Sequence, residues 1–125
     1  MEKILNLTAH DIVEFELKDC EDPNARHLVL KDQEHTSPWE VLPQSGQLAT
    51  ADRVVVGSGH NFEITYKNVS DLPEGYDLYV VSGVYVQACQ KLGRDISKLR
   101  VSYGAVYDAT DPRKVIGCLG LAIPV

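Results

Sequence analysis

Hydrophobic and polar residues alternate in short runs along most of this chain. Residues 13–17 place apolar side chains at every second position with glutamates between them, which predicts a strand with one buried face. Other short runs, rich in β-branched and aromatic residues, predict further strands. These cover residues 4–7, 27–30, 53–56, 62–66, 78–81, 99–102, 105–108 and 115–119.

One segment changes to a helical period. Its apolar residues recur at a spacing that would place them on one buried face: Val84, Ala88, Cys89 and Leu92. Ser82 precedes this segment as a natural N-cap, and Gly93 is well placed to end it. Strands that follow one another without helices between them, together with one principal helix, predict a single α+β domain with a mainly antiparallel sheet.

Glycine and proline mark the turns between the predicted strands. Residues 57–61 hold two glycines between two predicted strands, and we interpret them as a hairpin turn. A phosphate-binding loop is the weaker interpretation, because no Lys-Ser/Thr pair and no helix follow. A turn that contains Asp111 and Pro112 joins the last two predicted strands.

Composition and charge narrow the class of function. The chain has 125 residues, 44% hydrophobic and 24% charged, as in ordinary folded soluble domains. It shows no signal peptide and no apolar stretch near the length of about 20 residues that spans a bilayer, so we expect a cytoplasmic protein without membrane association. The formal net charge is -6, and residues 1–40 hold ten of the 18 acidic side chains. An acidic chain is a poor candidate for general nucleic-acid binding.

The cysteines and histidines give no sign of a metal site. Cys20, Cys89 and Cys118 are far apart and form no C-x-x-C pair, so we expect reduced and mostly buried thiols. The 4 histidines lack the H-E-x-x-H motif and any other compact ligand spacing. The sequence therefore predicts neither a metal nor another cofactor.

A local excess of basic residues is consistent with a site for a small anionic ligand. It consists of Lys91, Arg94, Lys98, Arg100, Arg113 and Lys114. Such residues also lie on solvated surfaces, and this alternative stays open. Ser82 and Gly83 offer a second anion-binding feature, the backbone N–H groups at the start of the predicted helix, for which plain capping is the simpler interpretation.

Several short motifs occur in a recognisable order. They are Asn6-Leu7-Thr8-x-His10, Leu42-Pro43-x-Ser45-Gly46, Leu72-Pro73-Glu74, residues 78–82, Arg94-Asp95, Val106-x-Asp108 and the run from Arg113 to Leu121. Together they resemble a family of small uncharacterised bacteriophage and prophage proteins that begin with an N-L-T-P-H stretch. The resemblance covers most of the chain except residues 18–40 and 52–70. Ala9 replaces the usual proline, and Gln47 and Thr50 stand where basic residues are expected.

The resemblance implies a phage protein, and an analogy with Thoeris anti-defence sponges extends it. Such sponges sequester nucleotide signals of the host immune response without catalysis, in pockets often built between protomers. Phosphates are bound by cations or backbone N–H groups, and a base by an aromatic ring. On this hypothesis we expect a homo-oligomer that binds a small anionic nucleotide-like ligand. The expected ligand-binding residues are Asn6, Thr8, His10, Ser82, Gly83, Arg94, Arg100, Tyr103, Tyr107 and Arg113.

Two other classes of function stay open. In a small nucleotide-processing enzyme, Asp95, Asp108 or His10 would serve in acid–base catalysis, although no motif sets their geometry. In an accessory protein that binds a host or virion protein, exposed aromatic residues would anchor the interface. The candidate anchors are Trp39, Tyr76, Tyr79 and Tyr85.

Overall fold

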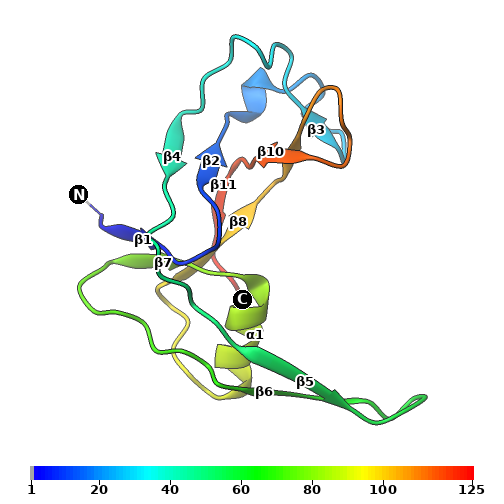
Figure 1. Cartoon of the computed structure of the whole chain (residues 1–125). Helices are drawn as coiled ribbons and strands as arrows, with labels where there is room; N and C mark the ends of the chain where they lie inside the picture. Colours follow the sequence, from blue (N-terminus) through cyan, green and yellow to red (C-terminus); the bar gives the residue numbers. More distant parts are fainter. Residues whose placement is uncertain (1) are drawn as a thin grey trace.

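The computed structural model describes residues 2–125, which form eleven strands, one α-helix and one 3-10 helix (Figure 1). In chain order these are β1 (Ile4–Asn6), β2 (Ile12–Glu14), η1 (Leu17–Asp19), β3 (Leu28–Val29), β4 (Glu40–Leu42), β5 (Asp52–Val56), β6 (Glu63–Lys67), β7 (Leu78–Val80), α1 (Gly83–Lys91), β8 (Leu99–Tyr103), β9 (Val106–Tyr107), β10 (Val115–Gly117) and β11 (Gly120–Ala122).

The largest sheet has the strand order β1-β7-β8-β11 and contains both strand directions. β1 pairs parallel with β7, and β7 pairs parallel with β8. β11 runs antiparallel to β8. The helix α1 connects β7 to β8, because parallel neighbours need a crossover connection rather than a tight hairpin. The three parallel strands therefore end at the same edge of the sheet.

The other strands form smaller sheets. One has the order β10-β9-β3, and the pairs β2-β4 and β5-β6 each form a two-stranded sheet. Across the described residues, four of the seven strand pairings are antiparallel. The α+β class with one principal helix is confirmed. Antiparallel pairing is only slightly in the majority, because α1 makes β7 and β8 parallel and long connections join the parallel pairs β1–β7 and β3–β9.

Most predicted strands are present, with shorter bounds. The strand predicted over residues 13–17 ends at Glu14, and η1 follows in place of its last residues. β4 and β11 lie outside the predicted ranges. Both are 3 residues long and pair with strands distant in the sequence, so local alternation gives no signal for them.

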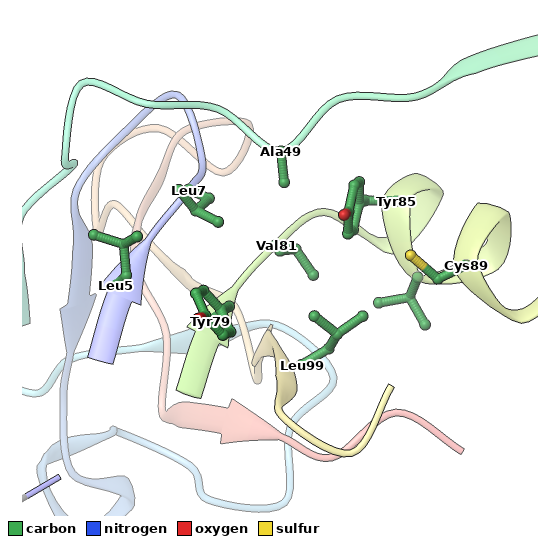
Figure 2. Packing of buried hydrophobic residues seen from close by; sticks show 9 residues of the cluster. Leu5, Leu7, Ala49, Tyr79, Val81, Tyr85, Cys89 and Leu99 are labelled. Carbon is green, nitrogen blue, oxygen red and sulfur yellow. The ribbon is translucent and has the colours of Figure 1, made fainter. Parts of the chain in front are cut away.

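The largest sheet is packed on both faces. On one face, α1 and the strands form the main core cluster (Figure 2), which consists of Leu5, Leu7, Ala49, Tyr79, Val81, Tyr85, Val86, Cys89 and Leu99. On the other face, Val80 packs with Ile12 and Cys118. Successive residues of a strand point to opposite faces, which is why Tyr79 and Val81 face the helix and Val80 does not.

The helix α1 begins and ends where its sequence predicts. Ser82 is the N-cap, and its hydroxyl accepts a hydrogen bond from the Tyr85 backbone N–H at 3.2 Å. Gly93 follows the helix with a φ of 72°, in the left-handed region that favours glycine. Both ends are therefore determined by local capping residues.

The buried face of α1 differs from the predicted one. Val84 and Leu92 are 39% and 50% exposed, whereas Tyr85 is only 1% exposed. The Tyr85 hydroxyl donates a hydrogen bond to the Ser70 carbonyl oxygen at 2.6 Å, so the ring is buried without an unpaired polar atom. The helix is therefore rotated relative to the prediction, with Tyr85 in place of Val84 and Leu92 in the core.

Most of the candidate interface aromatics are not available at the surface. Tyr79 and Tyr85 are 5% and 1% exposed and belong to the core, and Tyr76 is half-buried. Trp39 is the exception, at 53% exposed. Burial of the tyrosines contradicts an aromatic interface built from this set.

The thiols are buried, as predicted. Cys20, Cys89 and Cys118 form no disulfide within residues 2–125. Burial raises the pKa of the Cys20 and Cys118 thiols, which keeps them protonated at neutral pH.

Within residues 2–125, no helix has both the length and the apolar character needed to cross a membrane.

Candidate functional site

A cavity of about 440 Å³ lies at the edge of the sheet where β1, β7 and β8 end and α1 begins. It is lined by Leu7, Thr8, Ala9, His10, Ile12, Leu48, Ala49, Thr50, Val80, Val81, Ser82, Gly83, Val101 and Ser102, and we name it the strand-edge cavity. Sheets with parallel strands commonly bind ligands outside the carboxyl ends of those strands. Small-molecule sites typically have volumes of roughly 300–1,000 Å³, and this cavity is within that range.

Four of the residues predicted to bind ligand line this cavity: Thr8, His10, Ser82 and Gly83. They come from the loop after β1 and from the junction of β7 and α1, which are distant in the sequence. The lining contains no carboxylate, and His10 is its only histidine, lysine or arginine. The fold thus brings two separate candidate motifs together around one space whose lining carries no negative side chain.

The start of α1 supplies hydrogen-bond donors at the cavity wall. The first backbone N–H groups of a helix have no partner within the helix and form the positive end of its dipole. Ser82 accepts one of them, and Gly83 leaves space beside the others, because a Cβ added at Gly83 would meet no heavy atom within 4 Å. A ligand can therefore approach this backbone closely.

Asn6 shapes the cavity from within the fold. Asn6 is only 2% exposed. Its side-chain amide donates hydrogen bonds to the carbonyl oxygens of His10 and Leu42, at 3.0 and 2.9 Å. Its side-chain oxygen accepts hydrogen bonds from the Thr8 backbone N–H and hydroxyl at 2.9 and 2.6 Å. These four bonds use the hydrogen-bonding groups of the Asn6 side chain. Asn6 is therefore a positioning residue that holds the loop with Thr8 and His10.

The segment before β5 forms another wall. The Ser45 hydroxyl donates a hydrogen bond to the Asn6 carbonyl oxygen at 2.7 Å, and the Ala49 N–H donates one to the Leu7 carbonyl oxygen at 3.0 Å. These contacts place Thr50 beside the end of β1. Thr50 and Ser102 also line this cavity, although no motif in the sequence marks them as site residues; the only signal for Thr50 is its position where the resembling family has a basic residue.

The three candidate arginines do not line the strand-edge cavity. Each is instead close to polar groups of its own surroundings. The partners are the Ser70 carbonyl and Asp71 carboxylate for Arg94, the Ser97 and Leu99 carbonyls for Arg100, and the Asp111 carboxylate for Arg113. Arg94 follows the C-terminal end of α1, whereas the cavity lies at the N-terminal end. The arginines are close to one another in the sequence, but the structure does not bring them together into one basic site.

Tyr103 and Tyr107 line a different and smaller cavity of about 280 Å³, together with Arg26. The Tyr107 ring stacks on the His27 ring, with 3.7 Å between their centroids and 15° between their planes. The His27 ring therefore covers one of the two faces of the Tyr107 ring on which a base could stack. The tyrosines are therefore separated from Thr8, His10, Ser82 and Gly83, and this cavity is not continuous in its lining with the strand-edge cavity.

The candidate acid–base carboxylates hold turns. Hydrogen bonds from Ser97 lower the pKa of Asp95. Hydrogen bonds from Thr110 and Gln33 lower the pKa of Asp108 to about 2. A carboxylate with so low a pKa is neither an efficient general acid nor a strong base near neutral pH. Their geometry is that of turn-stabilising groups.

Comparison with known proteins gives no relative for this chain: no family model, no curated protein and no solved structure matches it. The phage resemblance therefore stays a prediction. Any function has to be argued from the cavities, their donors and their charges.

Proposed function

We propose that the chain binds a small anionic molecule of nucleotide type in the strand-edge cavity and holds it without changing it. The observation that supports this proposal is the meeting of Thr8, His10, Ser82 and Gly83 around one cavity at the ends of parallel strands. In a bacteriophage protein, such binding would sequester a host immune signal. The arginines and tyrosines of the sequence-based hypothesis have no part in this site.

The cavity chemistry fits a ligand with an anionic group and an apolar or aromatic body. A phosphate would lie at the start of α1, where backbone N–H groups and the helix dipole favour negative charge. Hydroxyls from Thr50 and Ser102 offer hydrogen bonds to a sugar, and the Thr8 hydroxyl, whose own hydrogen is bonded within the turn, can accept one. Apolar side chains such as Leu48 and Val81 offer contact surface for a base.

Replacing Gly83 with leucine is expected to block this site. The new side chain projects into free space rather than into the fold, so the variant should fold while its cavity is filled. We expect at least about tenfold weaker binding, or roughly 1.4 kcal/mol. The measurement is a thermal-shift screen followed by calorimetry with cyclic di- and trinucleotides, cyclic ADP-ribose isomers and NAD, since a ligand of the native state raises its melting temperature.

Gln90→Leu is the matched control, because it places the same side chain on the exposed far end of α1. Its affinity should equal that of the native chain. Recovery of intact ligand after heating is expected; an altered ligand would indicate an enzyme. Equal affinity in Gly83→Leu and the native chain, or loss on Arg94→Ala or Arg113→Ala instead, would contradict the cavity as the site. No shift with any of these molecules would overturn the proposed ligand class.

A second candidate function, association with another copy of this chain, is favoured by the hairpin of β5 and β6. The tip of the hairpin extends away from the rest of the chain, whereas the end of β6 lies beside α1, where the Tyr66 hydroxyl donates a hydrogen bond to the Gln87 side chain at 3.1 Å (Figure 1). Its two strands pair only with each other, from Asp52 opposite Lys67 to Val56 opposite Glu63. Its exposed apolar residues are Val55, Val56, Phe62 and Ile64, at 49%, 62%, 59% and 39% exposed. A two-stranded hairpin is marginally stable alone, and its open edges can accept another strand.

The edge strand β6 is complementary to itself. If two copies pair antiparallel with Thr65 opposite Thr65, Glu63 of each copy lies opposite Lys67 of the other, and Ile64 lies opposite Tyr66. Opposite charges and aromatic–aliphatic pairs across strands are favourable. A symmetric contact of this kind repeats each favourable pair. We therefore propose that β6 is the dimerisation edge.

Charge exchange on β6 tests this pairing. Glu63→Lys should weaken the dimer about tenfold, because each new lysine would face Lys67 of the second copy. Adding Lys67→Glu together with Asp52→Lys should restore the dimer, since the opposite charges are then exchanged both between the two copies and across each hairpin. The measurement is the molar mass by light scattering across a dilution series. Glu74→Lys, the same charge change outside the hairpin, should have no effect. A native chain that is monomeric at all concentrations, or a combined variant in which the dimer is not restored, would overturn the proposal.

A further inference from the structure

Glu14 is a buried acid without a partner. It is 3% exposed, and its carboxylate forms no hydrogen bond and no ion pair with any described residue, 2–125. None of the unpaired side-chain oxygens in these residues is completely enclosed, so the Glu14 carboxylate still reaches open space. It also lies directly opposite Glu40 in the pairing of β2 with β4. Like charges opposite each other on a sheet are unfavourable, as is an unpaired buried charge. Nothing in the described fold compensates this arrangement.

A second cavity supplies the space that this carboxylate faces. It has a volume of about 780 Å³ and is lined by Glu2, Glu14 and Glu40, by Trp39, and by apolar residues of β1, β4, β7 and β11. It includes the first residues of β1 and β7, so it lies at the opposite end of these strands from the strand-edge cavity. Its lining contains no lysine, arginine or histidine. We name it the acidic cavity.

Trp39 is held next to the buried acid. Its backbone N–H donates a hydrogen bond to the Glu14 carbonyl oxygen at 2.8 Å, and its residue remains 53% exposed. Tryptophan is the aromatic side chain that attracts cations most strongly. The acidic cavity therefore combines carboxylates, the best cation-binding ring and an apolar floor.

A metal ion does not fit this arrangement. Within the described residues, no group of three or more His, Cys, Asp or Glu side chains is close enough together to hold a metal. Oxygen ligands of hard cations lie about 2.0–2.6 Å from the ion, which requires a compact cluster. A cavity with carboxylates distributed around an apolar floor suits a longer cation whose charges are separated by methylene groups.

We propose that the acidic cavity binds an aliphatic organic cation, with ammonium groups at the carboxylates and Trp39 and its methylene chain over the apolar floor. One ammonium group would pair with Glu14 and relieve its repulsion from Glu40. Gly120 leaves the approach open: a Cβ there would lie 3.9 Å from the Glu14 Oε1 atom. This site is independent of the strand-edge cavity, and each can fail without the other.

Spermidine is the probe for this proposal, with putrescine as a shorter dication. The chain contains 1 tryptophan, so its fluorescence reports directly on the cavity, and calorimetry measures the affinity. We expect saturable binding of spermidine to the native chain at physiological salt. Glu14→Gln should weaken it at least tenfold while the fold is kept, because the amide has the same shape but no charge.

Two variants separate this site from general attraction to an acidic chain. Glu34→Gln removes one exposed charge outside the cavity and should leave the affinity unchanged. Gly120→Val keeps every carboxylate but fills the space in front of Glu14, and it should weaken binding as Glu14→Gln does. If Gly120→Val does not fold, Trp39→Leu followed by calorimetry replaces it, with the same expected loss.

The proposal is overturned by any of three results. One is that neither spermidine nor putrescine changes the tryptophan fluorescence or gives a heat of binding in calorimetry. Another is equal weakening by Glu34→Gln and Glu14→Gln, which would show non-specific attraction. The third is competition by Mg²⁺ at matched ionic strength that is as effective as competition by putrescine. Where the first result is accompanied by a response to a lysine-rich peptide, that response would identify a protein partner instead.

Discussion

Asn6→Ala is expected to lower the free energy of unfolding by about 3 kcal/mol, because it removes one side chain that serves four hydrogen bonds inside the fold. The carbonyl oxygen of Leu42 and the backbone N–H of Thr8 would lose their Asn6 partner in a part-buried region. Urea denaturation gives the change in free energy, and the melting temperature should fall by about 10 °C.

The matched control is Asn24→Ala, which removes the same side chain from an exposed turn. It should change the stability by less than about 0.5 kcal/mol. Asn6→Asp should resemble Asn6→Ala, since a carboxylate accepts hydrogen bonds but cannot donate to the His10 and Leu42 carbonyl oxygens. A loss below about 1 kcal/mol in both Asn6 variants would mean that the loop does not depend on this side chain.

The role of Asn6 gives a physical account of the motif near the start of the chain. Asn6 and Thr8 bond to each other, and both contact the His10 carbonyl oxygen, so these residues form one hydrogen-bonded turn. That turn holds Thr8 and His10 at the end of β1, on the wall of the strand-edge cavity. Of the motif residues, Asn6 therefore supports the fold, while Thr8 and His10 are placed at the cavity.

Elements with local causes could be predicted from the sequence. The start of α1 depends on Ser82, its end on Gly93, and the β5-β6 hairpin on the turn between two alternating runs. Thr8 and His10 likewise follow a strand, and Ser82 and Gly83 precede a helix. Their meeting in one cavity follows from the parallel pairing of β1 and β7, which local patterns do not specify.

Features that depend on distant contacts could not be predicted in this way. The candidate arginines are close in the sequence, yet Arg94 lies near Ser70 and Arg113 near Asp111, away from the strand-edge cavity. Tyr85 is a candidate interface anchor in the sequence, whereas the structure buries it with its hydroxyl hydrogen-bonded to the Ser70 carbonyl oxygen, a partner 15 residues away. Glu14 fits an alternating strand with a polar exposed face, whereas the structure buries it beside Cys118 and Gly120, which lie near the other end of the chain.

Glu14 is expected to lower the free energy of unfolding at neutral pH, and this effect can be measured. Burial, and then the Glu40 carboxylate, raise the pKa of Glu14 above its usual value of 4.5. A raised pKa in the folded state means that folding takes up protons, so the native chain is favoured below the unfolded pKa. It loses stability as the pH rises through the folded pKa of Glu14. Asp95 and Asp108, whose pKa values are lowered, act in the opposite direction in acid.

Glu14→Gln is therefore expected to stabilise the protein by about 1 kcal/mol at pH 7, and by less near pH 4, where the native glutamate is largely protonated. The difference between the native chain and the variant isolates Glu14, since Asp95, Asp108 and Glu2 are present in both. Urea denaturation at several pH values measures it, with Glu34→Gln as the exposed control that should show no such pH dependence. A variant less stable than the native chain at pH 7 would contradict a costly buried charge. A Glu14→Gln variant that is more stable but no longer binds spermidine would show that the native glutamate lowers stability at the place where a cation binds. This combination is expected when a residue is retained for function at the expense of stability.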